Sequence, residues 1–221
     1  MLGSITEKDS PETLIPKIIP QMDNLIMLKN NACFYPTFLS SRNDFSMQTF
    51  LHSHNVAVIA SDIAVRLGLI DEEIQTIYEL ALLHDVGKGK IPEKILFKPG
   101  KLTEEEFKVI KNHSTYSEEI YINIMKNSDK PGIKKKAKII RHHHENYDGS
   151  GYPDGLKGSA IPVLSRIITI ADIFEAIIHP RVYRPHPVAQ PMKLMERMAG
   201  NKIDKYIFKS IYDVLNSYIC Y

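Results

Sequence analysis

The sequence predicts an all-α fold, because its apolar residues recur at helical spacing and capping residues mark the ends of the apolar segments. No segment alternates apolar and polar side chains in the way that a half-buried strand requires. The chain has 221 residues, of which 43% are hydrophobic, so it can bury one substantial core. We expect a short N-terminal arm, residues 1–43, followed by one helical domain, residues 44–221.

The first long helix is expected at residues 44–66, with Asp44 as its N-cap and Gly68 as its C-terminal stop. Four prolines interrupt the preceding arm, which leaves room for one short helix near residues 21–28. One face of the long helix carries His52, Val56, Ile59, Ile63 and Leu67. His52 therefore faces the core, whereas His54 lies on a mixed face and is either exposed or a support for a neighbouring site residue.

The next helix begins at Asp71, the expected N-cap, and runs to the pair His84-Asp85, with Gly87 as its stop. Its inward face carries Ile77, Leu80, Ala81 and His84. An imidazole beside a carboxylate at a buried helix end is costly unless a partner or a metal ion satisfies both groups. For an isolated pair, a hydrogen-bonded core histidine is the favoured explanation, so the case for a metal depends on the rest of the chain.

A capping box of Thr103 and Glu106 predicts the start of the following helix. Phe107 and Ile110 form its inward side, and this direction continues to His113. The sequence thus points a further imidazole into the core.

The helix expected at residues 133–145 contains three consecutive histidines. Its polar side carries Lys135, Lys138 and His142. His143 and His144 follow apolar residues by one turn and face inward, so His142 is the outer member of the three.

The segment at residues 146–155 is dense in Gly, Pro and Asp, which excludes a helix or a central strand. Residues 165–178 are apolar almost all round and predict a central buried helix that contains Asp172. A buried aspartate needs a partner. A Pro-broken basic loop at residues 179–187 and two further helices, at residues 188–198 and 204–218, complete the chain.

The formal net charge of +2 gives no reason to expect a nucleic-acid polymer or a membrane as a partner. The lysines at residues 134–138 are typical of the solvent-exposed face of a helix. No apolar run reaches transmembrane length and the N-terminus lacks a signal-peptide pattern, so we expect a cytoplasmic location. Cys33 and Cys220 have no metal-type spacing and are expected to stay reduced.

The inward-facing candidates combine imidazoles, carboxylates and one lysine: His52, His84, Asp85, Lys88, His113, His143, His144 and Asp172. Buried groups of this kind require positive charge, and their donor atoms suit Fe, Mn, Co, Ni or Zn. A carboxylate shared between two ions is the usual way to hold them close together. The alternative is that each histidine is satisfied by its own hydrogen bonds. This explanation would have to apply independently to each of the five histidines.

With these residues the sequence resembles the HD-GYP group of the HD phosphohydrolase superfamily over about residues 47–215. Several motifs match in the family order, so the resemblance does not depend on one His-Asp pair. They include His52-Ser53, His84-Asp85-Val86-Gly87-Lys88, Lys98-Pro99-Gly100, His113, His143-His144-Glu145, Asp148-Gly149-Ser150-Gly151-Tyr152-Pro153, Ala171-Asp172 and Tyr183-Arg184.

The resemblance implies an HD-domain helical bundle with the HD-GYP extension, which hydrolyses cyclic di-GMP or a related cyclic dinucleotide by attack of a metal-bridging hydroxide. It implies two divalent ions, Fe or Mn first and Ni, Co or Zn as alternatives. Lys88 matches the lysine near the reacting phosphate, and Asp85 matches the carboxylate that bridges the ions. The other metal ligands that it implies are His52, His84, Asp172, His113, His143 and His144.

The resemblance also singles out residues around the substrate. Arg181 and Arg184 are candidate contacts to the second phosphate or to a guanine edge, because a guanidinium offers a fork of donors. Gly151 and Tyr152 either shape a tight turn or contact substrate directly, and both alternatives stay open. Glu145 is expected to orient an imidazole rather than to bind metal.

The chain departs from the family at three positions. Asn55 replaces an arginine and Glu175 stands where aspartate is frequent; both changes are interpreted as peripheral. Gln48 occupies the place of a glutamate that serves the third ion in three-metal members. A neutral amide is a weaker ligand, so we expect two ions, with Gln48 next to the site but outside the ligand set. Regulation is expected from the arm, a protein partner or expression.

Two other functions compete with hydrolysis of a cyclic dinucleotide. The chain is alternatively a non-hydrolysing module that binds the nucleotide or a partner protein, since a fold alone does not establish activity. It is alternatively an HD nucleotidase, which shares the core ligands but leaves the Gly-Tyr-Pro segment unexplained. Turnover of a cyclic dinucleotide with Fe(II) or Mn(II) under anaerobic conditions distinguishes hydrolysis from binding alone.

Overall fold

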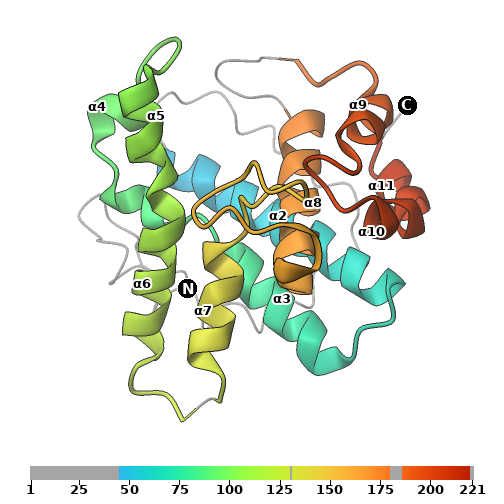
Figure 1. The fold of residues 1–221 in the computed structure, drawn as a ribbon, viewed down its shortest axis with the longest axis horizontal. Coiled ribbons are helices and arrows are strands. Elements are labelled where there is room, and N and C mark those ends of the chain that lie inside the picture. The colour runs from blue at the N-terminus through green and yellow to red at the C-terminus, as the bar shows by residue number, and fades with distance from the viewer. Residues whose placement is uncertain (1–44, 130, 180–185, 220–221) are drawn as a thin grey trace, which may run out of the picture. The chain divides into compact units, whose positions relative to one another are not determined.

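A computed structural model of the chain describes residues 45–129, 131–179 and 186–219 (Figure 1). The regular elements of these residues are helices, and one isolated backbone bridge joins Ala199 to Ile203. The all-α prediction is confirmed. The expected arm and its boundary at residue 43 lie outside the described residues. A membrane-spanning helix needs about 20 mostly apolar residues, and none of the described helices satisfies that requirement.

The described helices run in the following order along the chain. They are α2 (Phe45–Arg66), α3 (Asp71–Leu83), the 3₁₀ helix η2 (Val86–Lys90), α4 (Glu93–Leu96), α5 (Glu104–Lys111), α6 (His113–Met125), α7 (Ile133–Arg141), the 3₁₀ helix η3 (Gly158–Ala160), α8 (Val163–Ile178), α9 (Pro191–Met198), α10 (Lys205–Ser210) and α11 (Tyr212–Ser217).

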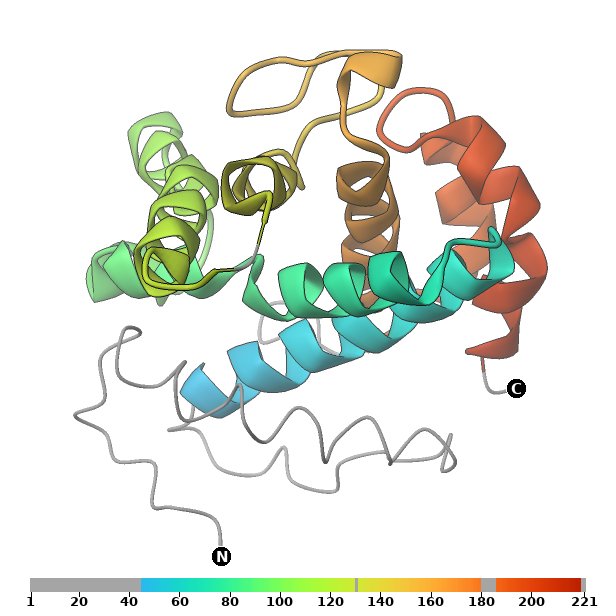
Figure 2. The same ribbon diagram turned by 90° about the horizontal axis from the view of Figure 1, so that it is seen from below.

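Helix α8 occupies a central position among the described elements. Figures 1 and 2 both place it between α7 and the C-terminal helices α9 to α11. On the other side of α7 lies α6, which packs along both α7 and η2. The prediction of a buried helix is confirmed, because α8 contributes fully buried Ile167, Ile168, Ile170, Ala171 and Phe174.

The predicted helix starts agree with the structure where a side chain caps the helix. Thr103 Oγ1 accepts a hydrogen bond from Glu106 N at 3.2 Å, and Thr103 N donates to the Glu106 carboxylate at 2.7 Å. The prediction for Asp71 was wrong: Ile70 is the N-cap and Asp71 is the first helical residue. A carboxylate in the first turn still favours this helix end through the helix dipole.

Helix α6 and several helix ends were not predicted correctly. The buried face of α6 contains Ser114 and Ser117 beside Ile120 and Tyr121, so apolar periodicity alone does not reveal it. Phe107 was expected in the core but is 45% exposed. The last helix is divided into α10 and α11 at Ile211, and Asp204 caps α10 through its hydrogen bonds to Tyr206 N and Ile207 N.

Gly87 does not stop α3, which already ends at Leu83; it lies within η2 instead. A Cβ atom at Gly87 would lie 2.1 Å from His113 O and 2.5 Å from Ser117 N. The Gly87 N–H donates to Ser117 Oγ at 2.8 Å. Glycine is therefore required here because the backbones of η2 and α6 approach each other closely.

Gly87→Ala is expected to lower the free energy of unfolding by about 1–3 kcal/mol, because the added methyl group forces two backbone segments apart. The change would also displace His113 from Asp85. Thermal unfolding compares the variant with Gly68→Ala, which has no atom within 4 Å of its added Cβ but a φ of +74°, so this control measures backbone strain without a steric clash. A melting temperature no lower than that of Gly68→Ala would contradict the packing role of Gly87.

Candidate metal centre

Five separate parts of the fold contribute side chains to one buried cluster. His52 comes from α2, His84 and Asp85 from the turn between α3 and η2, and His113 from the first position of α6. His143 and His144 directly follow α7, and Asp172 is part of α8. The structure therefore brings together all seven side chains that the sequence predicted as metal ligands.

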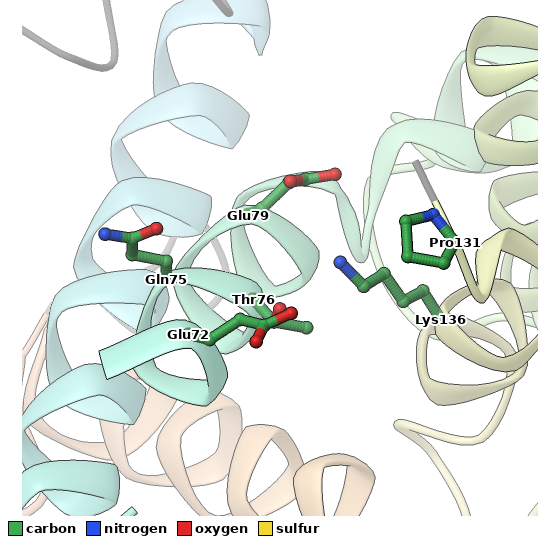
Figure 3. A pocket seen from close by; sticks show the side chains of 6 residues that line it. All are labelled: Glu72, Gln75, Thr76, Glu79, Pro131 and Lys136. Carbon is green, nitrogen blue, oxygen red and sulfur yellow. The ribbon is translucent and has the colours of Figure 1, made fainter. Parts of the chain in front are cut away.

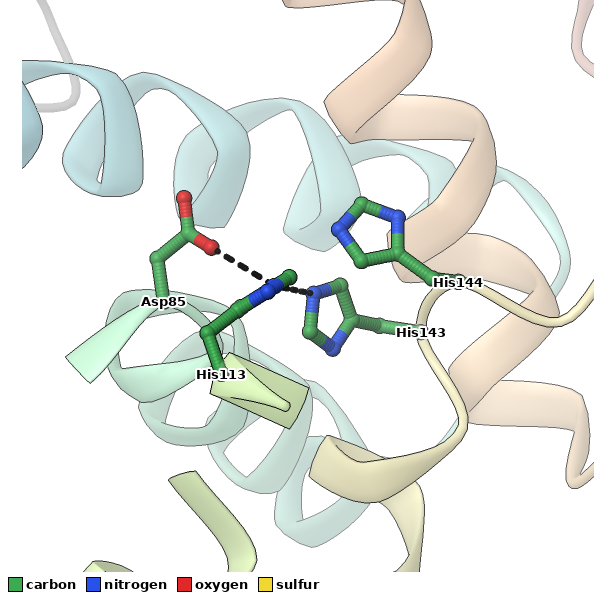
Figure 4. Close-up of side chains that lie close together, drawn as sticks. All are labelled: Asp85, His113, His143 and His144. Carbon is green, nitrogen blue, oxygen red and sulfur yellow. Dashed lines mark hydrogen bonds and ion pairs between the residues drawn. The ribbon is translucent and has the colours of Figure 1, made fainter. Parts of the chain in front are cut away.

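Asp85 connects two groups of possible ligand atoms. In the first, atoms of Asp85, His113, His143 and His144 lie within 4.8 Å of one another (Figure 4). His113 Nε2 is 3.3 Å from Asp85 Oδ1 and 3.3 Å from His143 Nε2. Donor atoms that converge in this way are suited to one cation.

The second group contains His52, His84 and the same Asp85. Asp85 Oδ2 lies 3.5 Å from His52 Nε2 and 3.4 Å from His84 Nε2. Asp172 approaches from α8, with Oδ1 3.1 Å from His52 Nε2 and 4.0 Å from His84 Nε2. The two oxygens of Asp85 thus face different groups, which is the arrangement that a bridging carboxylate needs.

Two buried polar atoms in this cluster, His84 Nε2 and Asp85 Oδ1, have no hydrogen-bond partner among the residues that the structure describes. His84 is fully buried and Asp85 is 2% exposed. An unsatisfied polar atom in such a place costs free energy, and a buried carboxylate costs more. A divalent cation would satisfy both atoms, so the residues fit the metal centre that the sequence predicts.

Three of the imidazoles are oriented by a backbone carbonyl of the preceding turn. The Nδ1 atoms of His84, His113 and His143 lie 2.5, 2.7 and 2.6 Å from the carbonyl oxygens of residues 81, 110 and 140. A carbonyl only accepts, so each Nδ1 carries the proton and donates. The Nε2 lone pair is then left for the cluster, as metal ligation requires.

Burial keeps several of these imidazoles neutral. It lowers the pKa of His144 to about 3, and with the neighbouring imidazoles it lowers that of His143 well below the usual value. Burial alone would raise the pKa of Asp85, but Lys88 and the imidazoles hold it well below its usual value. Neutral imidazoles and an ionised carboxylate are the protonation states in which these groups bind a cation.

The three consecutive histidines are not part of a helix, as had been predicted, because α7 ends at Arg141. Successive side chains on a helix diverge by about 100°, yet the rings of His143 and His144 lie with centroids 4.1 Å apart. Thr169 of α8 fixes this turn by donating to His143 O at 2.7 Å. His142 lies outside the cluster as predicted, but it is buried rather than on the lysine side.

His142 belongs to a third group, with Glu145 and Asp154, that holds the Gly-Tyr-Pro segment in place. His142 Nε2 and the Arg141 guanidinium both bind the Asp154 carboxylate, at 2.8 Å and 2.7 Å. Glu145 accepts from the backbone N–H groups of Asp154 at 2.7 Å and Leu156 at 3.0 Å. Glu145 thus orients the backbone of the Gly-Tyr-Pro segment, and the expectation that it orients an imidazole stays a prediction.

We expect His144→Ala to lose one of two bound ions, whereas His142→Ala keeps both and loses about 1 kcal/mol of stability through its hydrogen bond to Asp154. Elemental analysis of metal-loaded protein and thermal unfolding measure the two effects separately. The reverse pattern of metal loss would show that the assignment of the two imidazoles is incorrect.

Gly151 and Tyr152 connect the loop to the cluster. A Cβ atom at Gly151 would lie 2.1 Å from Asn146 N and 2.5 Å from His144 O, so the backbone beside His144 accepts only glycine there. Tyr152 N donates to His144 O at 3.1 Å, and its ring lies against the His144 ring with centroids 4.9 Å apart. The structure gives both residues a packing role next to a predicted ligand.

Glu175 is a site residue that the sequence interpretation missed. It was regarded as peripheral, yet it is 3% exposed and its Oε2 lies 2.7 Å from His52 Nδ1. Asn55, the other change regarded as peripheral, donates to the same carboxylate at 3.4 Å. A signal was present in the sequence, because Glu175 follows Asp172 by three residues in an otherwise apolar helix and so shares its face.

Lys88 lies beside the cluster, with Nζ 2.5 Å from Asp85 Oδ2 and its side chain 28% exposed. Arg181 and Arg184 lie outside the described residues. Gln48 is part of α2, one turn before His52, but its side chain is not among those described.

A separate cleft of about 260 Å³ contains none of the predicted site residues. It is lined by Glu72, Gln75, Thr76, Glu79, Pro131 and Lys136 (Figure 3).

A family model described as HD domain matches residues 23–207. The chain belongs to the HD domain family. A solved HDG"Y"P protein from Bdellovibrio bacteriovorus has the same fold as this chain. That structure has a TM-score of 0.59 at 20% identity, over 93% of this chain and 61% of the other.

Two curated relatives of this HD domain are phosphodiesterases. The chain is 39% identical over 155 residues to a cyclic di-GMP phosphodiesterase of Thermotoga maritima, covering 70% of this chain and 41% of that protein. It is 39% identical over 168 residues to 3'3'-cGAMP-specific phosphodiesterase 1 of Vibrio cholerae, covering 75% of this chain and 38% of that protein. The chain thus spans less than half the length of either relative.

Proposed function

We propose that this HD domain is a metal-dependent phosphodiesterase that hydrolyses cyclic di-GMP or a related cyclic dinucleotide. The observation that carries the proposal is the pair of ligand groups that share Asp85, because a phosphodiester is commonly cleaved between two closely spaced cations. The names of the two phosphodiesterase relatives support the substrate class. They include two different cyclic dinucleotides, so the bases are left to experiment.

We propose two ions, with Fe or Mn as the first candidates and Ni, Co or Zn as alternatives. His52, His84, Asp85 and Asp172 would hold one ion, and Asp85 with His113, His143 and His144 would hold the other. When bound, the ions would supply a hydroxide near neutral pH and neutralise charge on the phosphate oxygens. Two carboxylates and several neutral imidazoles give this centre little negative charge to balance a third ion.

The chain's own residues would position the substrate and neutralise its charge. Lys88 lies close to Asp85 and is partly exposed, so its ammonium group can offset the negative charge that develops on the phosphate. Tyr152 would form part of the wall next to His144. Arg181 and Arg184 would bind the second phosphate or a guanine edge.

A direct test supplies anaerobically purified protein, loaded with Fe(II) or Mn(II), with cyclic di-GMP, 3'3'-cGAMP and a mononucleotide panel. We expect linear dinucleotide, or mononucleotide derived from it, from at least one cyclic substrate. Binding of cyclic dinucleotide without turnover in the loaded protein would favour the non-hydrolysing module instead. Turnover of mononucleotides alone would favour an HD nucleotidase.

The ion count has its own test, because Gln48 stands where three-metal members of the resembled HD-GYP family have a glutamate. Elemental analysis or anomalous diffraction at the metal edge should give two ions per chain. Three fully occupied ions would refute the proposal. If the lack of a carboxylate at residue 48 prevents binding of a third ion, Gln48→Glu should raise the number of bound ions. An unchanged count of two would mean that another feature excludes the third ion.

A further inference from the structure

The imidazole of His52 is contacted at both nitrogen atoms by carboxylates from a single turn of α8. Nε2 lies 3.1 Å from Asp172 Oδ1, and Nδ1 lies 2.7 Å from Glu175 Oε2. Residues three apart are neighbours on one face of a helix, so Asp172 and Glu175 reach the ring from the same side of α8. The position of this ring is thus defined by α8 as well as by its own helix α2.

His52 differs in this respect from three other predicted ligands. His84, His113 and His143 each direct Nδ1 at a neutral backbone carbonyl within their own turn. The Nδ1 partner of His52 is instead a carboxylate, from a residue 123 positions away in sequence. A carboxylate that accepts a hydrogen bond from Nδ1 fixes the tautomer of the ring. It also raises the basicity of Nε2 more than a neutral carbonyl acceptor would, so Nε2 binds a metal ion more strongly.

The second oxygen of Glu175 faces two further polar groups. His179 Nδ1 lies 3.2 Å from Oε1, and Asn55 Nδ2 donates to Oε1 at 3.4 Å. Asn55 is on α2 and His179 directly follows α8, so the carboxylate joins these two parts of the fold. Its buried position, 3% exposed, keeps it from rotating away into water.

We propose that Glu175 is a positioning residue that sets the metal affinity of the group formed by His52, His84 and Asp85. This inference rests on the proposed metal centre but not on hydrolysis. Glu175 does not bind the ion; it directs the Nε2 lone pair of His52 and supplies negative charge behind the ring. The group that contains His113, His143 and His144 does not include His52 and should keep its affinity without Glu175.

The test is a titration of the metal-free full chain with Mn(II), with the free ion followed by electron paramagnetic resonance. Wild type should show two sites. Glu175→Gln keeps the size of the side chain but removes its charge, and it should weaken one site by about 10–100-fold while the other keeps its affinity. Glu175→Asp retains the charge and should recover affinity above that of Glu175→Gln.

Glu118→Gln is a matched control, since Glu118 is a partly buried carboxylate that pairs with Arg141 at 2.9 Å, away from His52. It should leave both affinities unchanged. Wild-type affinity at both sites of Glu175→Gln, equal weakening of both sites, or equal affinities of the Gln and Asp variants would each overturn the role of Glu175. Because the measurement contains no nucleotide, an absence of phosphodiesterase activity would leave its outcome unaffected.

Discussion

Asp85→Ala is expected to reduce hydrolysis of cyclic dinucleotides to the background rate and to prevent stable binding of both ions. The reason is that its two oxygens face different ligand groups, so one substitution removes a ligand from each. Binding to a divalent ion lowers the pKa of water from about 15.7 to about 7, so loss of the ions removes nearly all usable hydroxide at neutral pH. Turnover and elemental analysis of the same preparation measure both losses.

Lys88→Ala is the control for this experiment, because Lys88 also contacts Asp85 but is assigned to charge on the substrate. It should keep both ions and lower kcat by about 10²–10³-fold, the range observed when a group that stabilises developing negative charge is removed. Full activity of Asp85→Ala would refute the proposed centre. Loss of metal from Lys88→Ala would mean that Lys88 is needed to keep the metal bound.

The predicted ligands were identifiable because a buried imidazole or carboxylate on an apolar helix face is costly, and the chain repeats this cost on several helices. Burial of His84 follows from helical phase, whereas burial of Asp85, His113 and His143 agrees with the resemblance to a known family. Their convergence in one cluster depends on long-range packing of α6, α7 and α8, which periodicity does not specify. Here the resemblance, rather than the pattern, supplied the spatial grouping.

The features that the sequence did not predict depend on the exact path of the backbone. Gly87 and Gly151 resemble helix-stop and turn glycines, but each is required because another backbone segment lies where its Cβ would be. The imidazoles of His143 and His144 face one cluster because α7 has already ended. Glu175 was missed because its partner His52 lies far away in sequence, so only the packing of α2 against α8 reveals the pair.

Loading the protein with metal is expected to raise its melting temperature, and removal of the metal by a chelator should reverse the change. The folded chain holds these ligands together whereas the unfolded chain does not, so bound metal stabilises the folded state. One ion at a free concentration of about 100 times its Kd contributes about 2.7 kcal/mol. For a chain of this length that corresponds to an increase of about 5–10 °C for each ion.

Differential scanning calorimetry with and without Mn(II) measures this shift, and Asp85→Ala provides its control. In that variant the ligand groups have lost their shared carboxylate, so Mn(II) should leave the melting temperature unchanged. Equal stabilisation of both proteins by Mn(II) would mean that the ion binds elsewhere on the chain.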